Sequence, residues 1–102
     1  NHQVAIATKL EKAITVTAIY TVGGPSTISL TATYYYNDSL WTDASGTKIK
    51  TTPDATTDER VPTAQGALNN VSIPAGNSIW LTFTAVTTAS NKFIVKIEYT
   101  YQ

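Results

Sequence analysis

The chain of 102 residues is long enough for one domain that buries roughly two-thirds of the unfolded chain's surface. Its charged fraction is only 14% and its formal net charge is zero. A nucleic-acid-binding surface needs clustered Lys or Arg, so this charge pattern argues against one. No apolar run approaches the length of a membrane span, and the absence of cysteine excludes disulfides and thiolate metal sites.

The composition is typical of a β-protein that works outside the cell. Threonine is the commonest residue, and six tyrosines outnumber two phenylalanines. Both Thr and Tyr favour a pleated, half-wet surface. We therefore expect an extracellular or virion-surface location. The chain contains no methionine, which indicates a processed mature form or an excised piece.

The first third of the chain predicts an edge element followed by two long strands. Residues 1–10 alternate only briefly and are expected to form an N-terminal arm or an edge strand. Residues 13–22 predict a strand whose core face holds Ile14, Val16, Ala18 and Tyr20, with Thr15, Thr17, Ile19 and Thr21 outside. Residues 26–36 predict a second strand with Tyr35 on its outer face. The short Gly-Gly-Pro turn between the two strands predicts an antiparallel hairpin.

The middle of the chain predicts short strands and one long loop. Residues 40–42 and 47–51 are expected to be short strands around a turn. Residues 52–66 are polar, contain proline and lack periodicity, so they predict a long exposed loop. A further short strand is expected over residues 68–73.

Two strongly alternating segments end the chain. In residues 78–86 the predicted core face holds Ile79, Leu81 and Phe83, while the opposite face holds Trp80, Thr82, Thr84 and Val86. In residues 92–102 the predicted core face holds Phe93, Val95, Ile97, Tyr99 and Tyr101, while the outer face holds Ile94, Lys96, Glu98 and Thr100.

These elements together predict the fold class. About seven or eight strands, with turn signals roughly every ten residues and no helical period, are typical of an all-β domain. We predict one domain over residues 1–102, a single antiparallel two-sheet β-sandwich of the Ig-like or jelly-roll kind.

No residue pattern in the sequence predicts catalysis, a cofactor or a metal site. The only histidine is His2, so a Ser-His-Asp arrangement is not expected, and most acids fall in turns. Two groups of acids lie close in sequence without a recognised calcium spacing, and we expect them to solvate their loops: Asp54, Asp58 and Glu59, and Asp38 with Asp43. The chain is therefore expected to be no enzyme.

Apolar side chains on outward faces are the candidate interaction residues. Trp80 would join Ile94, Val86 and Ile19 in an outward patch if their strands are neighbours, and such patches usually mark interfaces. Two further aromatics have structural interpretations. Trp41 is expected to cover one end of the sandwich, and Tyr35 to be a cross-strand partner on a half-exposed face. An alternative is that Trp41, Trp80 and Tyr35 stack on sugar rings.

The last third of the chain carries a resemblance. The run "IPAGNSIWLTFTAV" (residues 73–86), followed by "FIVKIEYTY" (residues 93–101), resembles the closing hairpin of Ig-like or jelly-roll β-sandwich modules of phage tail-fibre and virion decoration proteins. The resemblance implies particle attachment or stabilisation, with no catalytic residues to carry over.

Composition, outward apolar residues and resemblance lead to one functional hypothesis. We expect a structural subunit of an extracellular or virion assembly, such as a phage fibre, a decoration or capsid-associated protein, or a surface filament. It would act through sheet-face and strand-edge contacts. Its partners would be copies of itself or other subunits, and residues 1–10 could add a strand to a neighbour. The alternative is a carbohydrate-binding module with a glycan partner.

Overall fold

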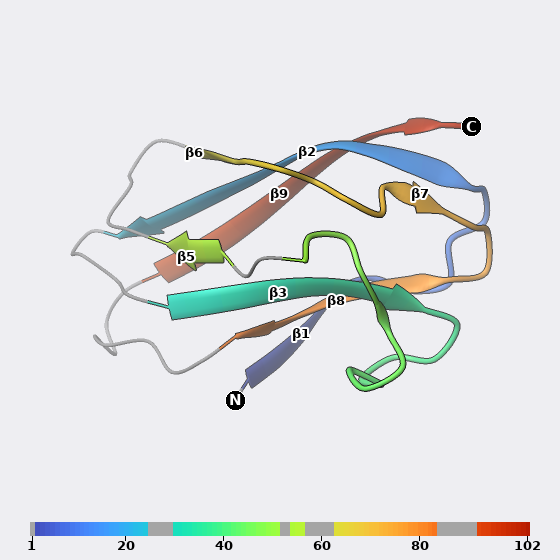
Figure 1. Cartoon of the computed structure of the whole chain (residues 1–102), viewed down its shortest axis with the longest axis horizontal. Helices are drawn as coiled ribbons and strands as arrows, with labels where there is room; N and C mark the ends of the chain where they lie inside the picture. Colours follow the sequence, from blue (N-terminus) through green and yellow to red (C-terminus); the bar gives the residue numbers. More distant parts are fainter. Residues whose placement is uncertain (1, 25–29, 52–53, 57–62, 84–91) are drawn as a thin grey trace.

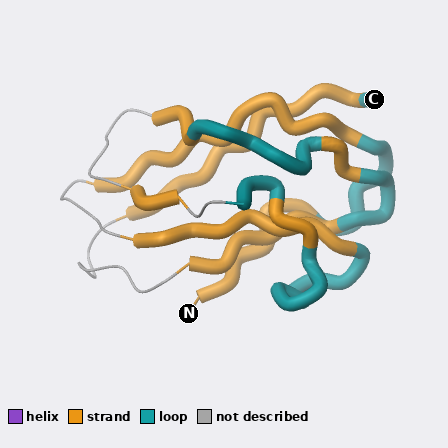
Figure 2. Tube along the Cα trace, in the orientation of Figure 1, coloured by secondary structure: helices purple, strands orange, loops and turns teal. Residues whose placement is uncertain are grey.

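The computed structural model describes residues 2–24, 30–51, 54–56, 63–83 and 92–102, and every regular element in this part of the chain is a β-strand. The strands form two antiparallel sheets that lie one above the other (Figure 1; Figure 2). The predicted all-β, two-sheet antiparallel sandwich is confirmed. No helix in the described ranges is long and apolar enough to cross a membrane.

The first sheet is built around two neighbouring strands, β8 and β3, which pair along most of their length. On the far side of β8 lies β1, so of the two alternatives for residues 1–10, an N-terminal arm or an edge strand, the structure shows an edge strand over His2–Ala7. On the far side of β3, two short strands pair with opposite ends of β3. The five strands of this sheet are β1 (His2–Ala7), β8 (Ser78–Phe83), β3 (Leu30–Asn37), β4 (Thr47–Lys48) and β5 (Asp54–Thr56).

The second sheet is built around the longest strand, β2 (Ile14–Gly24). One edge of β2 pairs with β9 (Lys92–Tyr101) along its whole length. Because a strand has only two edges, the two short strands β6 (Thr63–Gln65) and β7 (Ser72–Ile73) share the other edge of β2. This leaves β9 at one border of the sheet.

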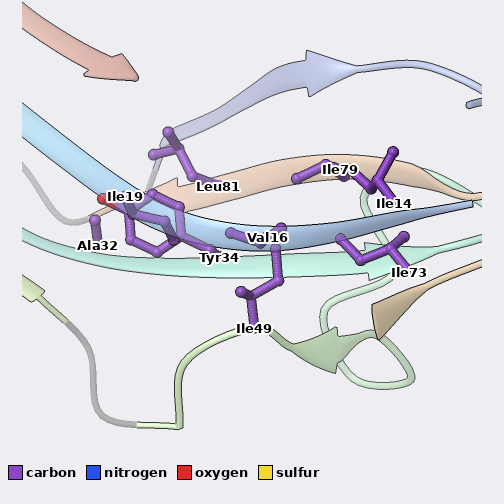
Figure 3. Packing of buried hydrophobic residues seen from close by; sticks show 9 residues of the cluster. All are labelled: Ile14, Val16, Ile19, Ala32, Tyr34, Ile49, Ile73, Ile79 and Leu81. Atoms are coloured by element: carbon purple, nitrogen blue, oxygen red, sulfur yellow. The ribbon is translucent and has the colours of Figure 1, made fainter. Parts of the chain in front are cut away.

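The core lies between β2 of one sheet and β3 and β8 of the other (Figure 3). Alternation along β3 and β8 was predicted correctly, because Ala32, Tyr34, Ile79 and Leu81 are all buried on the facing side. In the described part of the chain, the buried hydrophobic core consists of Ile14, Val16, Ile19, Ala32, Tyr34, Ile49, Ile73, Ile79 and Leu81.

A β-bulge in β2 overturns the predicted faces of its second half. The pairing with β9 shifts between Val16 and Ala18, so two residues of β2 oppose one residue of β9 there. An extra residue inverts the alternation that follows it. Ile19 and Thr21 are therefore buried, at 0% and 1% exposure, although the sequence pattern placed both outside.

The two predicted hairpins are wrong. β2 pairs with β6, β7 and β9, whereas β3 pairs with β4, β5 and β8, so consecutive strands lie in different sheets. The same holds for β8 and β9, which were expected to form the closing hairpin. Alternation specifies which face of a strand is buried, but it does not specify which strand is its neighbour in the sheet.

Backbone hydrogen bonds of Ile49, Asn69 and Val71 close one side of the sandwich. Ile49 donates its backbone N–H to the Tyr34 carbonyl at 2.9 Å and accepts from Asn69 at 2.8 Å. Val16 donates to the Val71 carbonyl at 2.9 Å. These backbone bonds connect the first sheet to the second on the side where β4 to β7 lie.

Three predictions for the middle of the chain need correction. Residues 40–42 form turns rather than a strand, and the strand expected over residues 68–73 is limited to β7. Residues 52–66, expected to be a loop, contain β5 and β6, while residues 52–53 and 57–62 lie outside the described part.

Candidate functional site

Trp80 lies on the outer face of the first sheet, as predicted, but it is not a surface residue. Its exposure is 0%. Tyr35 is directly opposite on β3, and the two rings stack with centroids 5.5 Å apart at 14°. On another side, Gly46 approaches so closely that a Cβ atom there would lie 3.0 Å from the indole. The loop between β3 and β4 therefore covers the indole.

Asp43 of the same loop holds this cover in place. Its Oδ1 accepts a hydrogen bond from Trp80 Nε1 at 2.7 Å, and its Oδ2 accepts one from Thr82 Oγ1 at 2.6 Å. Gln3 Nε2 of β1 also donates to Oδ1, at 3.0 Å. We call the arrangement of Tyr35, Asp43 and Gly46 around the indole the Trp80 cover. The cover gives the indole N–H a hydrogen-bond acceptor and buries the ring, so Trp80 and Tyr35 form a second small core on the outer face of the first sheet.

The other predicted interaction residues do not come together either. Ile19 is buried in the main core, and Val86 lies outside the described residues. Tyr35 is a cross-strand partner as predicted, but it is 9% exposed rather than half-exposed. The predicted patch of Trp80, Ile94, Val86 and Ile19 is therefore wrong for Trp80 and Ile19, and of its three described members only Ile94 is exposed, at 61%.

Trp41 was expected to be buried over one end of the sandwich, and that prediction is wrong. It is 46% exposed and adopts a φ of 69°, a region that bulky residues rarely occupy. Because Trp80 and Tyr35 are buried, they offer no ring face to a ligand. Trp41 is the one member of the predicted sugar platform that solvent reaches.

The open side of the sandwich lies between β1 and β9. Among the described strands, β1 pairs only with β8 and β9 pairs only with β2. Each strand therefore has one edge along which the described residues provide no backbone partner. Such edges present rows of N–H and C=O groups that can pair with another chain.

Three adjoining cavities follow these two edges, and we call them together the β1–β9 groove. The first, of about 370 Å³, is lined by residues that include Val4, Phe83 and Val95. The second, of about 260 Å³, shares Ile6 with the first and adds Ile97. The lining of both is largely apolar, so the groove exposes part of the core that a further strand would cover.

The third cavity forms the polar end of the groove, with a volume of about 470 Å³. It is lined by Tyr99 and Tyr101 of β9 and by the loop that follows β1, including Lys12. The Lys12 Nζ lies 5.6 Å from the centre of the Tyr101 ring. The pKa of Tyr99 is raised above its ordinary value. The largest cause is a side-chain hydrogen bond with Tyr101, followed by the charge of Tyr101 and then by burial.

Tyr99 and Tyr101 were predicted to be core residues, and that prediction is wrong in one respect. They continue the inward alternation of β9 opposite Val16 and Ile14, but they are 49% and 64% exposed. No described strand covers this end of β9.

The exposed apolar residues gather on the same two strands. The large hydrophobic side chains that are exposed in the described ranges are Val4, Trp41, Ile94, Tyr99 and Tyr101. All but Trp41 belong to β1 or β9. Val4, Tyr99 and Tyr101 line the β1–β9 groove, whereas Ile94 lies on the other face of β9. An exposed apolar lining usually marks an interaction site.

Within the described residues, no group of three or more His, Asp or Glu side chains is placed to hold a metal ion. Asp43, one of the acids weighed as a calcium ligand, instead accepts hydrogen bonds from Trp80 and Thr82, while Asp58 and Glu59 lie outside the described part. No family model, curated protein or solved structure matches the chain.

Proposed function

We propose that the protein is a non-catalytic interaction subunit of an extracellular or virion assembly, and that it joins its neighbours by accepting an extended polypeptide strand in the β1–β9 groove. The observation that carries this proposal is an apolar groove between two strand edges that no other described strand pairs. An added strand gains backbone hydrogen bonds from the edge and buries alternate side chains in the groove.

The route of attachment differs from the outward patch expected around Trp80. Because the indole is buried, it offers no sheet-face contact, whereas the strand-edge contact gains Val4, Tyr99 and Tyr101, which are exposed and line the groove. The threonine- and tyrosine-rich composition supports an extracellular or virion location. The resemblance to phage tail-fibre and decoration modules stays a prediction.

A library of random ten-residue peptides panned against the immobilised protein tests the proposal. The groove variant carries Val4→Lys and Tyr99→Lys, which place charges at two half-exposed positions that line the groove. The matched control is Trp41→Lys, because Trp41 has nearly the same exposure but does not line the groove.

We expect enriched peptides that alternate apolar and polar residues, bind the wild-type protein and the control, and fail to bind the groove variant. Circular dichroism confirms that the groove variant is folded. Enrichment of no peptide, or of peptides that bind the groove variant equally well, would contradict the proposal.

A further inference from the structure

The structure points to a specific occupant of the groove, and this inference rests on the proposed function. We infer that two copies of the protein associate through their β9 strands, side by side and antiparallel, about a twofold axis at Ile97. The second sheet of each copy then continues into that of the other. Three features support this dimer: the edge of β9 that no described strand pairs, the charges on its outer face, and the apolar residues that line the groove.

The edge available for this contact is long. β9 has ten residues, and β2 pairs with its inner edge from Lys92 to Tyr101. The bulge in that pairing lies in β2, so the alternation of β9 is regular along its length. A regular edge that no described strand pairs is the geometry that another extended strand can match.

The charges on β9 are complementary to themselves in one register. The outer face of β9 carries Lys96 and Glu98, one residue on each side of Ile97. In an antiparallel pair centred on Ile97, Lys96 of one copy lies opposite Glu98 of the other, and the twofold axis repeats this pair. Opposite charges placed directly across from each other stabilise a strand pair, whereas like charges destabilise it.

Both charges are exposed to solvent, and Lys96 Nζ also lies 5.5 Å from the centre of the Tyr20 ring. Within one chain Lys96 Nζ lies 3.2 Å from Glu98 Oε2, and their side chains are 62% and 43% exposed. An exposed ion pair of this kind contributes little to the stability of the fold. In the dimer, Lys96 and Glu98 of one copy lie opposite Glu98 and Lys96 of the other. These edge charges disfavour pairing with an unrelated strand, but they favour pairing with a second copy.

The inner face of β9 is complementary in the same register. Ile97 lies opposite Ile97 of the second copy, and Val95 lies opposite Tyr99. Val95, Ile97 and Tyr99 all line the β1–β9 groove. The second copy therefore brings to the mouth of the groove the apolar side chains that it lacks, and each copy does so for the other.

The test is a charge-reversal cycle measured by sedimentation velocity at low salt. Lys96→Glu and Glu98→Lys each place like charges opposite each other at two positions of the dimer. We expect each single variant to weaken the dimer by about tenfold or more, and the double variant to recover the wild-type dissociation constant within about threefold. Lys48→Glu, an exposed change of the same charge on β4, should leave it unchanged.

The outcomes separate this inference from the proposed function. A wild-type protein that stays monomeric at millimolar concentration overturns the inference, and binding of the selected peptides to the groove then leaves the proposed function standing. A double variant as weak as the single variants overturns the register centred on Ile97. If the wild-type protein dimerises and the groove variant with Val4→Lys and Tyr99→Lys does not, the groove is still the interaction site, in a different register.

Discussion

Replacing Asp43 by alanine tests whether the Trp80 cover is a second core. The change removes the acceptor of three hydrogen bonds, from Trp80 Nε1, Thr82 Oγ1 and Gln3 Nε2. The indole N–H belongs to a side chain with 0% exposure, so it loses its acceptor where water does not reach. An unsatisfied buried donor costs about 1–3 kcal/mol, and the two more exposed bonds together add about 0.5–1 kcal/mol, giving about 1.5–4 kcal/mol.

The assay is urea denaturation followed by tryptophan fluorescence. The chain has two tryptophans, so a Trp41→Phe background makes Trp80 the only reporter. Asp38→Ala is the matched control, because Asp38 is an exposed acid of the same loop and should change the free energy of unfolding by less than about 0.5 kcal/mol. Asp43→Asn keeps one acceptor oxygen, so its loss should be smaller than that of Asp43→Ala.

The reasoning would be refuted by an Asp43→Ala protein as stable as the Asp38→Ala control. An unchanged emission spectrum of the folded state in the same variant would point the same way, because it would mean that the indole environment does not depend on the carboxylate.

The remaining predictions concern the same cover and the tyrosines of the groove. Gly46→Ala should destabilise the fold by about 1–3 kcal/mol in urea denaturation, because its Cβ would press on the stacked rings, whereas Gly66→Ala, with open space, should be nearly neutral. Burial, with the Asp43 charge second, raises the pKa of Tyr35. The folded state therefore holds the Tyr35 proton more tightly than the unfolded state does, and this contribution to stability is fully present below about pH 10. The free energy of unfolding should fall as the pH rises above about 10, and it should fall less steeply in Tyr35→Phe. In an NMR titration Tyr101→Phe should lower the pKa of Tyr99 towards its ordinary value, and an unchanged value would contradict the hydrogen bond between them.

The fold class could be predicted because alternation reports directly on burial. Ile79, Leu81 and Tyr34 alternate with polar or covered residues, and all three are buried where the pattern placed them. Strand neighbours could not be predicted in the same way. β2 and β3 lie in different sheets, as do β8 and β9, and no local pattern distinguishes such a pair of strands from a hairpin.

Two long-range effects explain why the predicted outward patch around Trp80 does not form. The bulge after Val16 moves Ile19 into the core, and it depends on the pairing of β2 with β9 across the length of the chain. The cover over Trp80 depends on Asp43, which is 37 residues away in sequence. A tryptophan on the outer face of a sheet is either exposed to solvent or covered by a loop, and only the tertiary structure distinguishes the two.

The groove had one signal in the sequence. Tyr99 and Tyr101 extend the inward alternation of the last strand with aromatic residues that carry a polar group, which suits a half-covered position. The sequence pattern alone does not reveal that the opposite strand β1 ends at Ala7 and leaves these rings exposed.

Pulsed electron paramagnetic resonance tests most directly the claim that β9 joins a second copy. The chain has no cysteine, so Ile94→Cys and Thr100→Cys each give one spin label per copy, at exposed positions three residues on either side of Ile97. An axis at Ile97 predicts the same distance between copies for both labels, about 20 Å along the strands. Unequal distances would contradict that register, and the absence of any coupling between copies at millimolar concentration would contradict pairing through β9.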